Sequence, residues 1–452
     1  MLKNYFKISL RNIKRHKIYS IINIVGLAVE MTVFLLISFY VLNELSYDRF
    51  HKDTGSIYLV LRGENDFLMA PTSKLLAPAL KTELPEVINS TCFSKVPGTE
   101  KLLVRYGAKH FEEDISLTDS DFFKIFSFSF KEGNPDKAFE GPNSLLLTET
   151  AAKKYFGSRS PLGETVQVYM FGRKVDMKVT GVLEDLPSNT HFYSDMFIHY
   201  DLVRSLGLDW DRWDNQILKS YILVQDGSDI HSLSNKIREI EIKYHKSAGL
   251  EKLTYDLLSV TKIHLYSSNI KFLSATGDIK YIYIFSVAAF IILLIAGINY
   301  MNLSTAFSLK RTKEVGVRKV VGASRSSLVR QFLGETVVLT FVSLILAVFL
   351  AQFFLPAFNQ VSGKSLSLLN FSPVFVLGVL LIVLIISIFS GFYPALFLSA
   401  FKPVALMKIK STPKMKGVLI RKGLLLFQFS LSIILIISTL VVYNQLFFVR
   451  NT

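Results

Sequence analysis

Few residues of this chain stand in a pattern that supports catalysis or metal binding. No G-x-x-x-x-G-K-[ST] motif is present, so the sequence lacks the loop that holds a nucleotide phosphate in P-loop proteins. The eight histidines are scattered, and the single cysteine, Cys92, cannot form an internal disulfide. His191 and His199 flank Asp195 and could approach it, but ordinary surface histidines are the simpler interpretation. We therefore expect no enzyme, and no metal or cofactor bound by this chain.

Two acidic stretches leave alternatives open. The stretch FEEDISLTDSDFF, residues 111–123, lacks the central glycine of a calcium-binding loop, which favours a solvated turn. The stretch DWDRWDN places Trp210 and Trp213 among three aspartates. It is either a docking edge or a loop whose indole rings cover the side of the domain.

Seven basic residues lie between Lys310 and Arg330, with Glu314 as their one acidic neighbour. This segment directly follows a long apolar run. It could anchor the chain to lipid, bind nucleic acid or dock another protein. The choice depends on the elements that position it.

Those elements include apolar runs long enough to cross a membrane. Half of the 452 residues are hydrophobic and the mean hydropathy is +0.37. Each run reaches about 20 residues, the length that spans a hydrocarbon core. We expect an α-helical membrane protein with five transmembrane helices, at residues 18–43, 281–303, 328–355, 373–398 and 424–447.

Charge divides the chain into two parts. Residues 44–280 hold 29 basic and 33 acidic residues, whereas the remainder holds 22 basic and 3 acidic residues. Positive charge collects in short cytoplasmic loops, so the basic stretches 1–17, 310–330 and 402–422 are expected in the cytoplasm. The first is expected to be an amphipathic helix on the lipid surface and the last a basic linker. The basicity thus follows from membrane topology, and no nucleic-acid partner is expected.

The region 44–280 is expected to be a large extracytoplasmic α+β domain. Residues 44–100 and 219–275 each have the pattern strand, helix, strand, and two such units can pair into a ferredoxin-like layer. Residues 101–218 would form an inserted β-rich part, with a hairpin turning at Phe171 and Gly172.

Two features of the membrane part carry specific expectations. Glu30 lies in the middle of the first span, where it is either a protonated side chain bonded to a neighbouring helix or part of a proton pathway. The connector 306–327 is expected to be a short amphipathic helix with Glu314 and Arg318 paired four residues apart. A bend at Gly322, Ala323 and Ser324 would lead into the next span.

The run INYMNLSTAFSLKRTKEVGVRKVVGASRSSLVRQFLGE, residues 298–335, resembles the core of the FtsX/MacB family of ABC-transporter permeases. The segments DSDFFKIFSFSFKEGNP, PNSLLLTETAAKKYFGSRSPLGETVQV and VTGVLEDLPSNTHFYSD are similar to the external domain of MacB-type members, in which a porter-like part carries a β-rich insertion. The family commonly has a small residue where Glu30 stands.

The resemblance implies that the connector is the coupling helix, which docks on a separate MacB/LolD-type ATPase subunit that binds ATP and Mg²⁺. It further implies a second permease copy or half, contact with membrane lipid, a periplasmic adaptor with an outer-membrane channel in some members, and a place in the bacterial inner membrane. The residues expected to dock the ATPase are Lys310, Arg311, Lys313, Glu314, Val317, Arg318 and Lys319.

The expected function is to couple ATP hydrolysis by the partner to movement of the external domain, for export of antimicrobial compounds or peptides from the periplasmic side. Alternatives are a lipoprotein-releasing permease, an FtsX-like regulator of cell-wall hydrolases, and, from a different class, a membrane-anchored sensor. The span 424–447 resembles the opening of a second such unit, so either the chain is truncated or its partner half is supplied separately.

Overall fold

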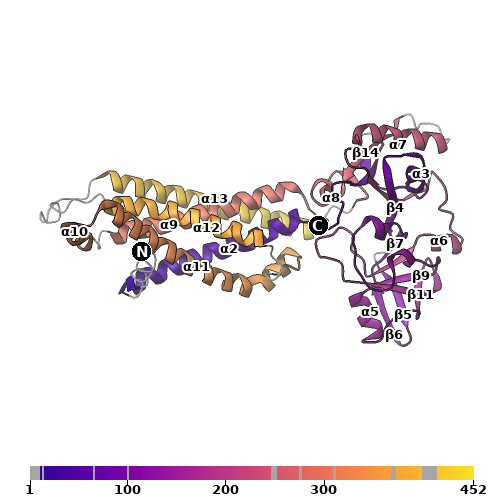
Figure 1. The fold of residues 1–452 in the computed structure, drawn as a ribbon, viewed down its shortest axis with the longest axis horizontal. Coiled ribbons are helices and arrows are strands. Elements are labelled where there is room, and N and C mark those ends of the chain that lie inside the picture. The colour runs from indigo at the N-terminus through magenta and orange to yellow at the C-terminus, as the bar shows by residue number, and fades with distance from the viewer. Residues whose placement is uncertain are drawn as a thin grey trace. The chain divides into compact units, whose positions relative to one another are not determined.

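The computed structural model describes residues 11–12, 15–64, 67–98, 101–245, 252–273, 277–308, 312–367, 373–399 and 415–451. The chain forms two compact units, one of residues 1–42 with 282–452 and one of residues 43–281 (Figure 1). Most of the amphipathic helix predicted over 1–17, and residues 402–414 of the predicted linker, lie outside the described residues.

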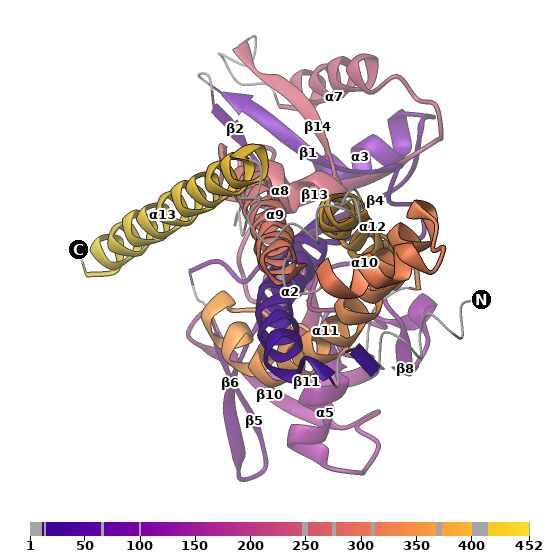
Figure 2. The same ribbon diagram turned by 90° about the vertical axis from the view of Figure 1, so that its left-hand side faces the viewer.

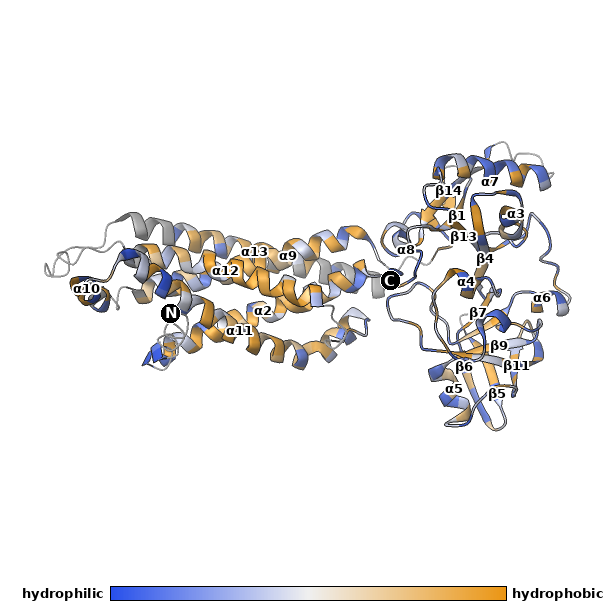
Figure 3. Cartoon of the chain, viewed as in Figure 1, coloured by the Kyte–Doolittle hydropathy of each residue, from blue (hydrophilic) through white to orange (hydrophobic). Residues whose placement is uncertain are grey.

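The first unit is helical and strongly apolar (Figure 3). Four of its helices are long and apolar enough to cross a membrane, which agrees with the first four predicted spans. Helices suit a lipid environment because they satisfy every backbone polar group internally. The helices are α2 (Lys17–Leu45), α9 (Ile279–Ser308), α10 (Thr312–Val320), α11 (Arg325–Ser362), α12 (Pro373–Ser399) and α13 (Met415–Asn451).

The helices α2, α9, α11 and α12 share a core, and Figure 2 shows the bundle from its end. Each contributes to it, with Met31, Leu293, Ala347 and Val383 as examples. Small residues allow close contact between α11 and α12, as at Gly391, where an added Cβ would lie 2.6 Å from Thr336 Oγ1. The fifth predicted span, 424–447, falls within α13, whose apolar stretch among the described residues is the shorter Lys422–Ser438.

The second unit begins with a four-stranded antiparallel layer. Its strands follow the order β14, β1, β13, β4, so each strand-helix-strand unit encloses a strand of the other. Leu59 pairs with Tyr221, and Val60 with Leu257. The elements are β1 (Ile57–Glu64), α3 (Leu76–Glu83), β4 (Val87–Lys95), β13 (Gln216–Val224), α7 (Ile230–Tyr244) and β14 (Thr254–Ser259).

Pairing continues from β4 through a second set of strands, in the order β7, β12, β9, β11, β10, β5, β6. These strands are β5 (Leu102–Tyr106), β6 (Lys109–Glu113), β7 (Ile115–Thr118), β9 (Ser144–Thr148), β10 (Thr165–Met170), β11 (Arg173–Leu183) and β12 (Met196–His199). Shorter elements are β2 (Phe67–Met69), β3 (Thr72–Ser73), β8 (Phe130–Glu132), β15 (Ile270–Lys271), α4 (Phe122–Ile125), α5 (Glu149–Phe156), α6 (Leu202–Ser205) and α8 (Val260–Tyr266).

The cores of the second unit follow this division of strands. One cluster is built wholly from residues 96–203, and another from residues 60–87 and 222–257 beneath α3 and α7. A third, rich in phenylalanine, joins residues of both sets. The hairpin predicted at Phe171 and Gly172 is confirmed between β10 and β11, with both residues at positive φ.

Candidate functional site

The helix α10 connects two long helices of the bundle and ends in a sharp bend. Gly322 has φ of 99°, a conformation that glycine adopts without strain, and the N–H of Ala323 donates to the carbonyl of Arg318. Ser324 then caps α11, because its hydroxyl accepts from the N–H of Ser327 at 3.2 Å. The sequence therefore places a stop and a start signal within three residues.

An apolar contact seats α10 on the bundle. Val315 is 2% exposed and packs with Leu328 and Phe332 of α11 and with Ala395 of α12. The opposite side of the connector is also apolar but faces outward. Val317, Val320 and Val321 are 64%, 74% and 81% exposed, and their spacing places them together at the end of α10.

Two charged residues of α10, Arg318 and Lys319, contact the bundle. Arg318 forms an ion pair with Glu314 at 2.8 Å and donates to Gln331 Oε1 of α11 at 2.5 Å. Lys319 donates to the backbone carbonyl of Ser399, the last residue of α12, at 2.6 Å. Of the other predicted docking residues, Lys310 and Arg311 lie outside the described residues, as does the side chain of Lys313.

Two family models match this chain. The MacB-like periplasmic core domain matches residues 20–240, and the FtsX-like permease C-terminal domain matches residues 286–403, which includes α10. The chain belongs to the MacB/FtsX family of ABC transporter permeases. As the helical unit indicates, this permease is a multi-pass membrane protein with an extracytoplasmic domain.

Curated relatives of the permease match part of their length. They include the macrolide export ATP-binding/permease protein MacB of Bdellovibrio bacteriovorus, 27% identical over 264 residues, which are 58% of this chain and 38% of that protein. The ABC transporter permease YknZ of Bacillus subtilis is 26% identical over 248 residues, 54% of this chain and 57% of YknZ. The pyoverdine export protein PvdT of Pseudomonas aeruginosa is 25% identical over 248 residues, 54% of this chain and 34% of PvdT.

Two solved structures resemble parts of the permease. The extracellular domain of YknZ has a TM-score of 0.33 at 15% identity and covers 45% of this chain and 99% of its own. The periplasmic region of MacB from Actinobacillus actinomycetemcomitans has a TM-score of 0.34 at 16% identity. The match covers 46% of this chain and 90% of that structure.

Glu30 lies in a row of polar side chains inside the permease bundle. Its Oε1 accepts from Asn299 of α9 at 2.6 Å, and Asn299 Oδ1 accepts from Gln428 of α13 at 2.8 Å. Glu30 Oε2 is buried without a hydrogen-bond partner among the described residues. The geometry fits the prediction of a glutamate bonded to a neighbouring helix, while the proton pathway stays a prediction.

The sequence analysis did not predict a group of buried, hydrogen-bonded polar side chains in the external unit, just after the end of α2. Asp48 is fully buried; its Oδ1 accepts from Thr190 Oγ1, and its Oδ2 lies 2.8 Å from His191 Nδ1. His191 Nε2 lies 2.9 Å from the Tyr221 hydroxyl. Burial alone would raise the pKa of Asp48, but the attraction and hydrogen bonds of His191 and Thr190 outweigh it and hold the pKa below its ordinary value.

A second buried pair joins the chain segments that leave and enter the helical unit. Glu44, at the end of α2, lies 2.9 Å from His264 of α8, and Tyr47 stacks on His264. An added Cβ at Gly277, just before α9, would lie 2.9 Å from Glu44 Oε2. In the sequence, Glu44 and Gly277 stand next to predicted spans, whereas no pattern indicated His264.

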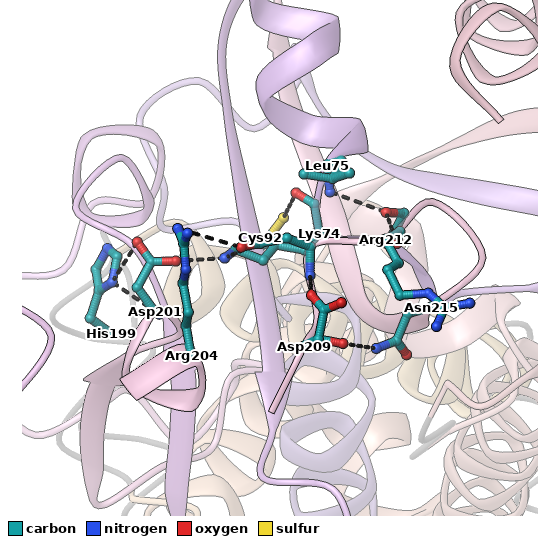
Figure 4. A network of polar contacts seen from close by, with 11 residues as sticks. Lys74, Leu75, Cys92, His199, Asp201, Arg204, Asp209, Arg212 and Asn215 are labelled. Atoms are coloured by element: carbon teal, nitrogen blue, oxygen red, sulfur yellow. Dashed lines mark hydrogen bonds and ion pairs between the residues drawn. The ribbon is translucent and has the colours of Figure 1, made fainter. Parts of the chain in front are cut away.

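Lys74 lies at the centre of a network of polar contacts in the external unit (Figure 4). Its ammonium donates to Asp201 and Asp211, both at 2.6 Å, and its carbonyl lies 3.8 Å from Cys92 Sγ. Burial raises the pKa of the Cys92 thiol above its ordinary value. Lys74 thus fixes the stretch DWDRWDN to the four-stranded layer.

His191 and His199 have partners other than Asp195. His191 pairs with Asp48, whereas His199 Nδ1 lies 3.6 Å from Asp201. Among the described residues, no group of three or more histidine, cysteine, aspartate or glutamate side chains could hold a metal ion.

Proposed function

We propose that this permease is the membrane subunit of an ABC-type exporter in which a separate MacB/LolD-type ATPase docks on α10. The packing of α10 against the bundle supports the proposal. One side of the helix is buried against α11 and α12 through Val315, while Val317, Val320 and Val321 are largely exposed. Exposed valines in a cluster are costly in water and favour a protein contact.

This proposal divides the predicted docking residues into two groups. Val317 belongs to the contact surface with the ATPase, together with Val320 and Val321, which the sequence prediction did not include. Arg318 and Lys319 hold α10 on the bundle through Gln331 of α11 and Ser399 of α12, and Glu314 pairs with Arg318 within α10. Binding of ATP and Mg²⁺ by the partner would then draw two permease copies together and move their external units.

The relatives and the charge pattern support a proposal for the cargo and for the orientation in the membrane. Relatives are named for export of macrolides and of pyoverdine, so we propose export of small molecules or peptides from the periplasmic side. We also propose that α10 and the N-terminus lie in the cytoplasm and that the protein is in the inner membrane, because positive charge collects in short cytoplasmic loops and basic stretches surround α10.

The docking surface can be tested with Val317→Asp. We expect a co-expressed candidate ATPase of the MacB/LolD type to bind Val317→Asp at least ~10-fold more weakly than the wild type, because an unpaired carboxylate in an apolar contact costs a few kcal/mol. Association is measured by biolayer interferometry with the permease in nanodiscs. The matched control is Val361→Asp, the same change at a 90% exposed position at the far end of α11.

Val361→Asp should bind the ATPase as the wild type does. Equal binding by Val317→Asp and the wild type would contradict docking on α10.

A further inference from the structure

Acidic residues are scarce outside the external unit, and one of them, Glu335, is hydrogen-bonded to other side chains of the helical unit. Residues 1–43 and 281–452 hold three: Glu30, Glu314 and Glu335. Glu335 lies on α11 and is 9% exposed. A buried carboxylate in a membrane protein is costly unless it is hydrogen-bonded, so its partners indicate what it is for.

The partners of Glu335 connect α10 to the start of the chain. Glu335 Oε1 accepts from Asn12 Nδ2 at 2.6 Å and from Gln331 Nε2 at 3.0 Å. Gln331 is 7% exposed, and its Oε1 accepts from Arg318 of α10 at 2.5 Å. Because Gln331 and Glu335 stand four residues apart, they share one face of α11. The result is a continuous row of side chains from α10 across α11 to residue 12.

This row fixes the orientation of α10 as well as its position. One terminal nitrogen of Arg318 pairs with Glu314 and the other donates to Gln331, so the planar guanidinium has a defined direction. Apolar contacts such as that of Val315 are not directional and would allow α10 to roll about its axis. A hydrogen-bonded guanidinium opposes that movement.

A second tie runs to the end of α12. Lys319 donates to the carbonyl of Ser399, one of the final helix carbonyls that lack a partner within the helix. Arg325, the first residue of α11, donates to the Ser399 hydroxyl at 3.2 Å. The connector is thus attached to α11 and to α12 by separate polar contacts.

We propose that Gln331 and Glu335 are positioning residues that brace the coupling helix: they act through Arg318 to make α10 move as one body with α11, so that ATP-driven movement of the ATPase reaches the bundle. This rests on the proposed function, and it adds a requirement that docking alone does not contain. A permease in which this row of hydrogen bonds is broken should still bind its ATPase, but the movement of the ATPase should hardly reach the bundle.

The experiment uses the full chain in nanodiscs together with the co-expressed candidate ATPase of the MacB/LolD type. Gln331→Leu and Glu335→Leu should bind the ATPase within about twofold of the wild type, while the permease-dependent stimulation of ATP hydrolysis falls by about tenfold or more. Glu335→Gln should restore most of the stimulation, because its amide oxygen still accepts from Asn12 and Gln331. The control is Gln352→Leu, at an exposed position of α11, which should change neither quantity.

A double variant separates a brace from general loss of packing. The double variant Arg318→Ala with Gln331→Leu should stimulate ATP hydrolysis at least as much as whichever of the two single variants stimulates it less. The reason is that both changes break the same row of side chains. A nitroxide at Val320, read by electron paramagnetic resonance without ATPase, should become more mobile in Glu335→Leu and not in Glu335→Gln.

The outcomes distinguish the brace from docking itself. Full stimulation by Gln331→Leu and Glu335→Leu, or an unchanged nitroxide spectrum, overturns the brace and leaves docking intact. Normal binding by Val317→Asp overturns docking. If a leucine variant does not fold, Arg318→Gln carries the test: it removes the charged donor from the exposed end of the row and should lower stimulation with binding preserved.

Discussion

Arg318 illustrates how the tertiary structure gives a residue a partner that its sequence pattern does not indicate. Its basic character and its spacing from Glu314 predicted a charged surface for an ATPase. In the structure its guanidinium donates to Gln331, and the exposed side chains among the described residues of α10 are Val317 and Val320. Helical spacing shows which residues share a face, but the neighbouring helices determine which face is covered.

His51 is a second residue whose surroundings determine its behaviour. It is 3% exposed, with the rings of Phe126 and Phe128 at 5.0 Å and 5.2 Å, and its Nδ1 accepts from the N–H of Ser127. Burial lowers the pKa of His51 to about 4; the charge of Asp48 opposes this shift and that of His191 adds to it. The folded chain therefore holds His51 neutral at pH values where the unfolded chain protonates it.

This predicts acid sensitivity of the external unit. Between the unfolded pKa of 6.5 and the folded pKa of about 4, the unfolded state binds more protons, so stability falls as the pH falls. From pH 7 to pH 5, His51 should account for about 2 kcal/mol of lost stability. Both tryptophans, Trp210 and Trp213, lie in the external unit, so their fluorescence reports its unfolding selectively.

The measurement compares the wild type with His51→Asn, which keeps an acceptor near Nδ1 but does not titrate. The unfolding midpoint of the wild type should fall more steeply on acidification than that of the variant. His231→Asn, at an exposed position on α7, should follow the wild type. Parallel curves for the wild type and His51→Asn would refute the assignment.

At the scale of elements, the contact between α11 and α12 depends on one glycine. A Cβ at Gly391 would lie 2.6 Å from Thr336 Oγ1 and 2.9 Å from Thr336 Cβ, so the helices would have to separate. Gly378, on the same helix, has open space at its Cβ position. Both positions are glycines of α12, and they differ in how closely α11 packs against them.

Gly391→Ala should therefore destabilise the bundle by about 1–3 kcal/mol, the usual cost of overpacking, while Gly378→Ala should not. The loss of helical circular dichroism during titration with SDS measures this, because the long helices dominate the signal. A midpoint for Gly391→Ala at or above that of Gly378→Ala would show that α11 and α12 are not in close contact.

At the scale of the whole molecule, the single cysteine offers a test of topology. Cys92 is buried, and burial raises the pKa of its thiol, so the wild type should not react with a membrane-impermeant maleimide. Ser326, next to the bend after α10, and Ser365, between α11 and α12, are both exposed. Cysteines at these positions should mark opposite sides of the membrane.

In spheroplasts we expect Ser365→Cys to be labelled at once and Ser326→Cys only after permeabilisation. Inside-out vesicles should give the reverse pattern, and the wild type should remain unlabelled in both. Labelling of Ser326→Cys in intact spheroplasts would place α10 outside and remove the basis for ATPase docking.

The sequence by itself determined four of the five predicted spans, the external α+β domain, the helical connector and the bend at Gly322. These depend on local properties: hydropathy over about 20 residues, alternation in strands, charge density and turn chemistry. The tertiary structure decided the partner of each polar side chain. Arg318 and Gln331 are 13 residues apart, Lys74 and Asp201 are 127 apart, and Asp48 and His191 are 143 apart.

No local pattern specifies such pairs, because chain segments that are distant in sequence meet only when the units fold. For the same reason the sequence identified α10 but not the side of it that remains exposed. The acceptors that cover its charged residues are Gln331 of α11 and the terminal carbonyl of α12, and packing of the bundle brings both to α10.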